Sequence, residues 1–310
     1  MSATAETSLP RRWYHFLPAT VTTTTRIFAW STLATQIIIV GTGGAVRLTG
    51  SGLGCDTWPQ CTEDSFVATP EMGIHGLIEF GNRTLTGLLL IVALITFLLV
   101  IRTRPTARGL IWPILAIGGG IAVQGVVGGI TVWTGLNSYI VGLHFVISSA
   151  LVALSALLVW RCYHHRSERL KVQPVWVTAV TYAAALFAAV TVVIGILTTG
   201  SGPHAGDADT PRNGLNPELL QHLHSYPAYI LAALTVVLLV AAALRPSTLL
   251  LRWTIVLAVA ELAQIVIGLV QARMGLPPLL VGIHMVLACV LVSAMMAVVL
   301  ALRQPAHARF

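Results

Sequence analysis

Residues 135–145 read GLNSYIVGLHF, and residues 275–285 read GLPPLLVGIHM. The two stretches are copies of one pattern, shifted by 140 residues (275 minus 135), and the shift aligns His144 with His284. The match extends upstream, where Gln124 aligns with Gln264. Both histidines lie in long apolar runs, and a histidine inside a bilayer is costly. The repeat therefore predicts a duplicated membrane fold with one candidate functional histidine in each copy.

The composition is that of a membrane protein. The chain has 310 residues, of which 56% are hydrophobic and 9% are charged, and its mean hydropathy is +0.83. Soluble domains carry roughly 25% charged residues, so we expect an all-α integral membrane protein. Eight apolar segments are long enough to cross a bilayer, which takes about 20 residues. They lie near residues 27–46, 74–101, 109–133, 139–160, 174–198, 218–244, 251–272 and 279–302.

The distribution of Lys and Arg predicts the orientation. One set of loops, together with both tails, holds most of them: Arg11, Arg12, Arg26, Arg102, Arg104, Arg108, Arg161, Arg166, Arg169, Lys171, Arg245, Arg252, Arg303 and Arg309. The opposite loops carry Arg47, Arg212 and Arg273 among acidic residues. We expect a plasma-membrane protein with both termini in the cytoplasm and an N-terminal tail rather than a cleaved signal peptide. The net charge of +7 then reflects orientation and requires no nucleic-acid partner.

Four spans in each copy return the chain to the same side, so the copies are predicted to be two parallel four-helix-bundle repeats. We place them at residues 27–165 and 174–302, between a tail at residues 1–26 and one at residues 303–310. Their first spans match at RLTGSGLG (47–54) and LTTGSGPH (197–204). Their second spans match at LIEFGNR (77–83) and LLQHLHS (219–225), which pairs Glu79 with Gln221 and Asn82 with His224.

The second copy is predicted to bind haem. At about 1.5 Å per residue, His224 and His284 lie at similar depths, roughly 9 and 8 Å inside their spans. The second and fourth helices of a four-helix bundle can face each other across the core. Two histidines that face each other there meet the requirement for bis-histidine haem ligation. The alternative, a hydrogen-bonded core histidine, explains one such residue better than a matched pair.

The first copy holds a different set of side chains in the same frame. His144 takes the place of His284, Asn82 takes the place of His224, and His75, Glu79 and Asn82 share one helix face. One iron ligand with a carboxyl group and an amide is typical of a site that holds a substrate and moves protons. Two alternatives stay open: Glu79 forms a structural ion pair with Arg83 at i+4, and His75 is a surface residue at the membrane edge.

Other polar residues have weaker claims. Cys55 and Cys61 lie in an outer loop, where an oxidising compartment allows a disulfide, and free thiols or a metal pair are the alternatives. Arg47, Arg83, Arg212 and Arg273 can pair with carboxylates, including haem propionates. We expect His204 to be solvated, Glu261 to serve in helix packing, and Cys162 and Cys289 to be packing residues. The chain has no CxxCH haem-attachment motif.

The run GTGGAVRLTGSGLGCDTWPQC (41–61) resembles the first helix and outer loop of bacterial haem A synthases, and the similarity covers all eight spans. The resemblance implies an enzyme that oxidises a methyl group of haem O to a formyl group by successive hydroxylations, giving haem A for terminal oxidases. It implies a Cys55–Cys61 disulfide and a b-type haem between His224 and His284. It also implies a haem O site in the first half, with Glu79 and His144.

The sequence departs from the family at one position. The family commonly has Glu-x-x-His-Arg in the second span, whereas this chain has Glu79-Phe-Gly-Asn82-Arg83. Either His75 replaces the missing histidine, or the substrate iron is five-coordinate or water-bound. We therefore expect catalysis to depend on Glu79, as a proton carrier or as the group that stabilises a cationic intermediate, and on His144. His75, Asn82 and Arg83 complete the predicted substrate site.

The predicted partners are haem O and haem A, a haem O synthase, an electron donor such as quinol, membrane lipid and a second copy of the chain. Two other functions fit parts of the pattern. A dihaem b-type protein that oxidises quinol needs paired histidines in both halves, and Asn82 argues against it. A two-repeat secondary transporter, with Glu79 and Glu261 as coupling groups, would contain no haem.

Overall fold

The computed structural model describes residues 17–103, 109–164, 169–171, 173–207, 209–245 and 248–305. Within these ranges, eight helices are long and apolar enough to cross a membrane, which confirms the predicted all-α fold. Their bounds are Thr23–Leu48 (α1), Gly73–Val100 (α2), Ile111–Trp133 (α3), Ser138–Tyr163 (α4), Val175–Ser201 (α5), Pro217–Ala243 (α6), Thr248–Arg273 (α7) and Pro278–Ala301 (α8). Most of the two predicted tails lies outside the described residues.

Short elements complete the chain. Two 3-10 turns flank α2, at Pro70–Met72 (η2) and Ile101–Thr103 (η3). Strands β1 (Arg169–Lys171) and β2 (Arg303–Pro305) pair antiparallel, with Leu170 opposite Gln304. The pair joins the α4–α5 connection to the segment after α8, on the side where α1 begins. We call this the tail side, and we call the opposite side, which bears the long connections 49–72 and 202–216, the loop side.

Polar residues at the helix ends explain where several helices begin. Thr22 caps α1 by accepting a hydrogen bond from the Thr25 amide. Asn137 caps α4 by accepting from Tyr139, and Asn216 caps α6 by accepting from Leu219. These side chains satisfy amides that the first helical turn leaves without partners. Pro217 and Pro278 open α6 and α8, at positions where a missing amide hydrogen costs nothing.

The repeated Gly-Leu pair forms the same turn twice. Gly135 and Leu136 have φ values of 58° and 59°, and Gly275 and Leu276 have φ values of 75° and 61°. Leu136 donates its amide to the Thr131 carbonyl at 2.7 Å, and Leu276 donates to the Gln271 carbonyl at 2.8 Å. A left-handed leucine is rare because its Cβ crowds the backbone. The turns before α4 and α8 therefore share one unusual backbone path, as the repeated sequence does.

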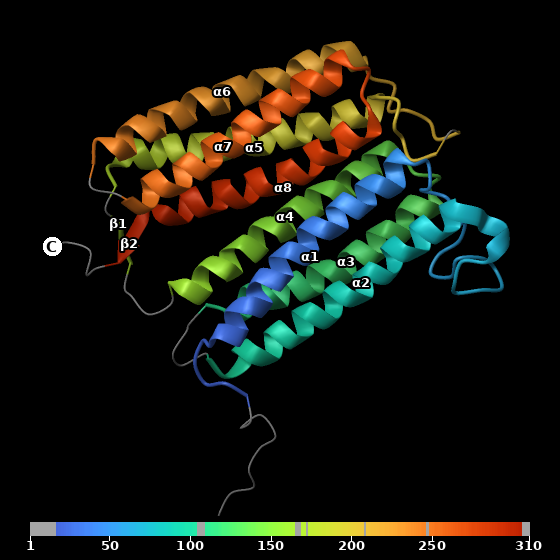
Figure 1. The fold of residues 1–310 in the computed structure, drawn as a ribbon, viewed down its shortest axis with the longest axis horizontal. Coiled ribbons are helices and arrows are strands. Elements are labelled where there is room, and N and C mark those ends of the chain that lie inside the picture. Colours follow the sequence, from blue (N-terminus) through green and yellow to red (C-terminus); the bar gives the residue numbers. More distant parts are fainter. Residues whose placement is uncertain are drawn as a thin grey trace, which may run out of the picture.

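The helices gather in two groups of four, α1–α4 and α5–α8, which lie side by side in Figure 1. Helices α1, α4, α5 and α8 lie at the boundary between the groups, where α1 and α4 contact α8. Small residues allow the close approach there: a Cβ on Gly142 of α4 would meet Ile196 of α5, and one on Gly282 of α8 would meet Leu48 of α1. That the two groups are parallel repeats stays a prediction.

The buried apolar residues concentrate between the middle of the molecule and the tail side. The first group buries Val100, Leu110, Ile114, Ile117 and Leu158 together. The second group buries Val177, Leu238, Leu250, Leu257 and Val298 in the same way. Packing of this kind stabilises the helix ends of the tail side. The candidate site residues lie toward the loop side. The tightly packed apolar core and the candidate site therefore occupy opposite ends of the helix groups.

Candidate functional site

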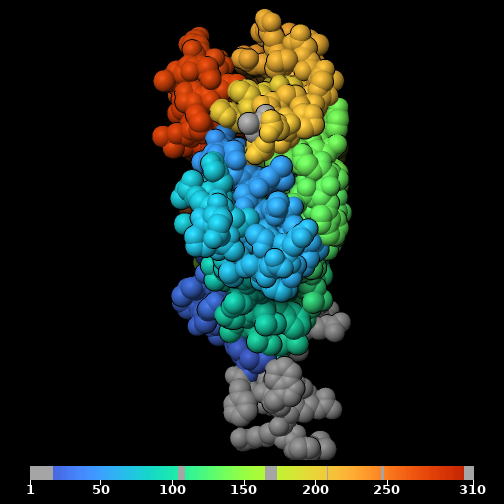
Figure 2. Space-filling model, turned by 90° about the vertical axis from the view of Figure 1, so that its right-hand side faces the viewer, coloured from blue at the N-terminus to red at the C-terminus, as the bar shows by residue number. Residues whose placement is uncertain are grey.

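The first long connection, residues 49–72, folds over the loop-side end of α1–α4 (Figure 2). Cys55 and Cys61 are joined by a disulfide in the structure, with their Cα atoms 4.5 Å apart. Trp58, between them, packs edge-on against Trp133 at the end of α3, with ring centroids 5.4 Å apart. The connection is therefore a fixed cover over the first helix group.

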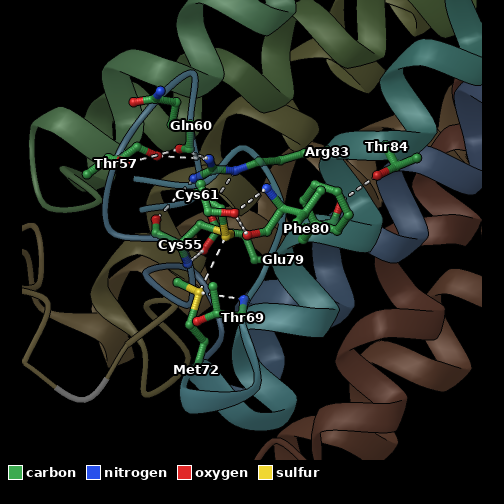
Figure 3. The surroundings of a disulfide bond; sticks show 12 residues. Cys55, Thr57, Gln60, Cys61, Thr69, Met72, Glu79, Phe80, Arg83 and Thr84 are labelled. Carbon is green, nitrogen blue, oxygen red and sulfur yellow. Dashed lines mark hydrogen bonds and ion pairs between the residues drawn. A yellow bond between two sulfur atoms is a disulfide. The ribbon is translucent and has the colours of Figure 1, made fainter. Parts of the chain in front are cut away.

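Arg83 of α2 joins this cover to the helix, as Figure 3 shows. Its guanidinium donates to the carbonyl oxygens of Cys55 (3.0 Å), Thr57 (2.8 Å) and Gln60 (3.0 Å). It also donates through Nη2 and Nε to Oε1 of Glu79, at 2.6 and 3.1 Å. A rigid fork of donors suits such a set of acceptors. The ion pair considered from the sequence is therefore present, and the three loop carbonyls are partners that the sequence did not indicate.

Glu79 is buried, with 5% of its surface exposed. Its second oxygen, Oε2, accepts a hydrogen bond of 2.7 Å from the backbone amide of Cys55. Both carboxyl oxygens are thus held, one by Arg83 and one by the disulfide segment (Figure 3). These fixed donors orient the buried carboxyl group, and the same hydrogen bonds anchor the cover to α2.

We expect Arg83→Met to destabilise the folded protein, because it leaves the buried Glu79 carboxylate without its counter-ion. The loss is on the order of 2–4 kcal/mol, since removal of one partner of a buried ion pair typically costs 3–5 and Arg83 is still a fifth exposed. The check is the unfolding midpoint of the purified protein in detergent. The double variant Arg83→Met with Glu79→Gln should recover part of the loss, and equal midpoints for Arg83→Met and the wild type would contradict the pairing argument.

Asn82 and His75 have partners of their own. Asn82 accepts a hydrogen bond of 2.8 Å from the Thr42 hydroxyl of α1 through Oδ1. His75, in the first turn of α2, is exposed, and its Nδ1 lies 2.8 Å from the Ser51 hydroxyl. His75 also lines a loop-side cavity of about 610 Å³ beside Asp56. Since His75 is already hydrogen-bonded at the membrane edge, its replacement of the missing histidine stays a hypothesis.

His144 lies two turns into α4, and Gln124 of α3 fixes the backbone there. The Gln124 amide donates to the His144 carbonyl at 2.9 Å and to the Ser148 hydroxyl at 2.5 Å. Nδ1 of His144 is buried and has no partner among the described residues. A Cβ on Gly128 would lie 3.4 Å from Cε1 of the ring. In the described part of the chain, no hydrogen bond links His144 to His75, Glu79 or Asn82.

His224 and His284 face each other across the second helix group, with ring centroids 6.3 Å apart and ring planes at 73°. A metal–imidazole bond is about 2 Å long and the ring centroid lies about 1 Å behind its nitrogen, so two rings that share one metal have centroids roughly 6 Å apart. Nδ1 of His224 lies 2.9 Å from the Thr191 carbonyl, which can only accept, so Nδ1 carries the hydrogen and Nε2 is left as a ligand. The pair fits a bis-histidine iron site.

Small residues and an amide frame this pair. A Cβ on Gly195 would lie 2.7 Å from Cε1 of His224, and one on Gly268 would lie 3.4 Å from Cε1 of His284. Gln264 donates to the His284 carbonyl at 3.2 Å, as Gln124 does to His144. Nδ1 of His284 and Oε1 of Gln264 are buried without partners among the described residues. Unpaired buried polar atoms are costly, and they are expected where a ligand completes a site.

Other residues that the sequence singled out form contacts outside the two candidate sites. Arg47 donates to the carbonyls of Thr199 (2.8 Å) and His204 (2.5 Å), and so links α1 to the second helix group instead of pairing with a carboxylate. His204, expected to be solvated, is half-buried, and its Nε2 lies 2.8 Å from the Leu276 carbonyl. Glu261 is buried and accepts a 2.7 Å bond from Thr235, as a helix-packing residue would.

Arg212 likewise donates to backbone carbonyls, those of Thr210 and Pro203. Cys162 and Cys289 are buried cysteines outside the disulfide, and both belong to the apolar cluster of the first helix group. Thr191, Gly195 and Thr42 are site residues that sequence reasoning missed. Thr191 acts through its backbone, which carries no residue signal, whereas the closeness of Gly195 and Thr42 to the sites depends on helix packing.

In the described residues, eight helices long enough to span a membrane, a covered carboxyl group in one helix group and a facing histidine pair in the other define a polytopic membrane protein with a candidate bis-histidine metal site. The COX15-CtaA family model, described as cytochrome oxidase assembly protein, matches residues 26–296, and the chain belongs to this family.

Similar proteins carry related names. Heme A synthase of Bacillus pumilus (strain SAFR-032) is 34% identical over 149 residues, which are 46% of this chain and 47% of that protein. Heme A synthase of Listeria monocytogenes serovar 1/2a is 28% identical over 178 residues, 54% of this chain and 57% of that protein. Protoheme IX farnesyltransferase of Thermus thermophilus is 35% identical over 79 residues, 25% of this chain and 13% of that protein. The matches thus span about half the length of the haem A synthases.

Proposed function

We propose that this protein is a haem A synthase, an oxidoreductase that converts a methyl group of haem O to a formyl group and gives haem A for terminal oxidase assembly. Family membership and the relatives named Heme A synthase support the proposal. The observation that carries it is the difference between the halves: His224 and His284 face each other at 6.3 Å in one, whereas Asn82 bonds to Thr42 in the other. One half suits a resident haem and the other a haem that must leave.

In the second half, His224 and His284 would hold a b-type haem. The bound haem would supply one-electron transfer. Thr191 keeps the His224 ring oriented by accepting from Nδ1, and Gln264 fixes the backbone beside His284. Gly195 leaves the room that the ring of His224 occupies. We propose a quinol as the electron donor.

In the first half, His144 would bind the iron of haem O, and Glu79 would accept and return protons as the methyl group is oxidised. Arg83 and the Cys55 amide orient the carboxyl group of Glu79. The disulfide-closed cover would limit the access of bulk water to this end of the helix group, which would strengthen electrostatic interactions inside. Asn82 offers an amide where the family commonly has a second histidine, so iron ligation there rests on His144.

We propose that haem O reaches the protein from a haem O synthase. The partial similarity to a protein named for farnesylation of protohaem IX supports a partner of this kind.

The 140-residue repeat and the recurrence of the same turn and the same glutamine contact support two parallel four-helix repeats. The excess of Lys and Arg on the tail side supports cytoplasmic termini.

The absorption spectrum of the purified protein, with extraction of its pigments, tests the proposal. We expect one low-spin b-type haem per chain and haem O or haem A in sub-stoichiometric amount, because one site keeps its haem and the other releases it. Two low-spin b-haems per chain would favour the dihaem electron-transfer protein instead, and a protein without haem would favour the transporter.

We expect Gly195→Ala to lower occupancy by the b-type haem, because the added Cβ would lie 2.7 Å from Cε1 of His224 and displace the ring. The reduced-minus-oxidised spectrum at equal protein concentration measures the occupancy, and a loss of at least half is expected. The matched control is Gly118→Ala, since nothing lies within 4 Å of a Cβ at Gly118. Equal spectra for the two variants would contradict the assignment of His224.

A further inference from the structure

A cavity of about 490 Å³ lies on the tail side, at the opposite end of α1 from the candidate site. Arg26, Trp30, Ser31 and Ala34 of α1 line it together with Tyr163, the last residue of α4. No residue of the proposed reaction belongs to it. Its position at the ends of two spanning helices places it where the polar headgroups of a bilayer meet the hydrocarbon.

Arg26 is the charged group of this cavity, and its charge is not compensated within the described part of the protein. Its Nε is buried without a hydrogen-bond partner, and the described residues offer its guanidinium no carboxylate. The guanidinium lies over the Tyr163 ring, 4.8 Å from the centroid. A guanidinium with free donors binds phosphate oxygens well. The first turn of α1, which begins at Thr23, adds a positive helix end beside it.

The walls of the cavity are amphipathic. Trp30 donates from Nε1 to the Tyr163 hydroxyl at 3.2 Å, and each of these two residues is 48% exposed. Trp and Tyr are enriched at the membrane–water boundary, where a polar edge and an apolar ring are both satisfied. Exposed Ile27, Ala34 and Ile38 form a stripe along α1 that runs from the cavity toward the hydrocarbon. Small Ser31 and Ala34 leave a groove between the larger side chains.

We propose that this cavity is a binding site for an anionic phospholipid. Arg26 contacts the phosphate, Trp30 and Tyr163 flank the glycerol region, and one acyl chain lies along Ile27, Ala34 and Ile38. An anionic lipid is favoured over a zwitterionic one because no acidic side chain among the described residues lines the cavity and because the tail side is rich in Arg. The site goes beyond the proposed reaction and does not depend on it.

Native mass spectrometry of the delipidated full chain in detergent tests the site, with phosphatidylglycerol and phosphatidylcholine as probes. The wild type is expected to bind phosphatidylglycerol more tightly than phosphatidylcholine, and Arg26→Gln to weaken phosphatidylglycerol binding about tenfold, since one charge-assisted contact is lost. Arg245→Gln is the matched control: Arg245 also lies over an aromatic ring, 5.0 Å from that of Trp176, but lines no part of this cavity. Equal weakening by both substitutions would overturn the proposal.

Two further arms keep the result interpretable. Ala34→Phe fills the groove on an exposed helix face without a change of charge, and it should also weaken phosphatidylglycerol binding. Inorganic phosphate at a large excess should leave lipid binding unchanged, because the acyl chain contributes to affinity; full displacement by phosphate would mean that the site binds a free anion. Unchanged lipid binding in both Arg26→Gln and Ala34→Phe would contradict the site outright.

Discussion

Replacement of His224 by alanine is expected to abolish the low-spin b-type haem spectrum of the purified protein. The ring faces His284, with centroids 6.3 Å apart, and the Thr191 carbonyl orients it through Nδ1, which leaves Nε2 free to bind iron. Loss of one of the two histidines that would hold the iron is expected to weaken haem binding or to empty the site. We expect haem content to fall at least tenfold or the remaining haem to become high-spin.

The matched control is His222→Ala. His222 lies on the same helix two residues earlier, where it is exposed. The same spectrum and haem content as the wild type are expected for this variant. If His222→Ala removed the spectrum and His224→Ala preserved it, the bis-histidine assignment would be wrong.

Substitution of Glu79 by glutamine is expected to lower haem A formation by about 100-fold or more, which is the usual contribution of a positioned proton-transfer group. Glutamine keeps the size of the side chain, and its carbonyl oxygen can still accept from the Cys55 amide. It cannot take up and release a proton. Haem O should therefore accumulate while the b-type haem spectrum stays as in the wild type. Extraction and chromatography of haems O, A and B measure the effect.

Two comparisons separate chemistry from anchoring of the cover. Glu71→Gln changes an exposed carboxylate within the same connection, in η2, and should leave haem A formation unchanged. Arg83→Met loosens the cover but keeps the carboxyl group, so it should retain more activity than Glu79→Gln. Undiminished haem A in Glu79→Gln would remove Glu79 from the mechanism, and equal losses in Glu79→Gln and Arg83→Met would reduce its role to anchoring.

Much of the fold could be predicted because the bilayer imposes a simple length rule. Each of the eight apolar runs became a helix, and the bounds differ from the prediction by only a few residues. The left-handed leucines at 136 and 276 could not be predicted from composition, since leucine disfavours that conformation. The repeated Gly-Leu sequence indicated that both copies contain the same turn, but the backbone geometry of the turn is seen only in the structure.

Some contacts of the candidate site could likewise be predicted from the sequence, and others could not. The facing of His224 and His284 followed from their matched depths, because the bundle geometry relates its second and fourth helices. The i+4 spacing indicated the Glu79–Arg83 ion pair as one alternative, and the structure contains it. The carbonyls that Arg83 binds belong to a loop whose path is fixed by packing, as in the contact between Trp58 and Trp133. Arg47 likewise donates to backbone carbonyls of the other helix group. The local sequence around Arg47 does not indicate these partners.

Haem A synthase activity is tested by haem extraction from membranes of a bacterial host that makes haem O and lacks its own haem A synthase, with and without this chain. We predict that haem A appears only when the wild-type chain is expressed, and that Glu79→Gln and His144→Ala yield haem O without haem A. The proposed function would be contradicted if membranes with the wild-type chain showed the b-type haem spectrum of the purified protein and yielded only haems B and O on extraction.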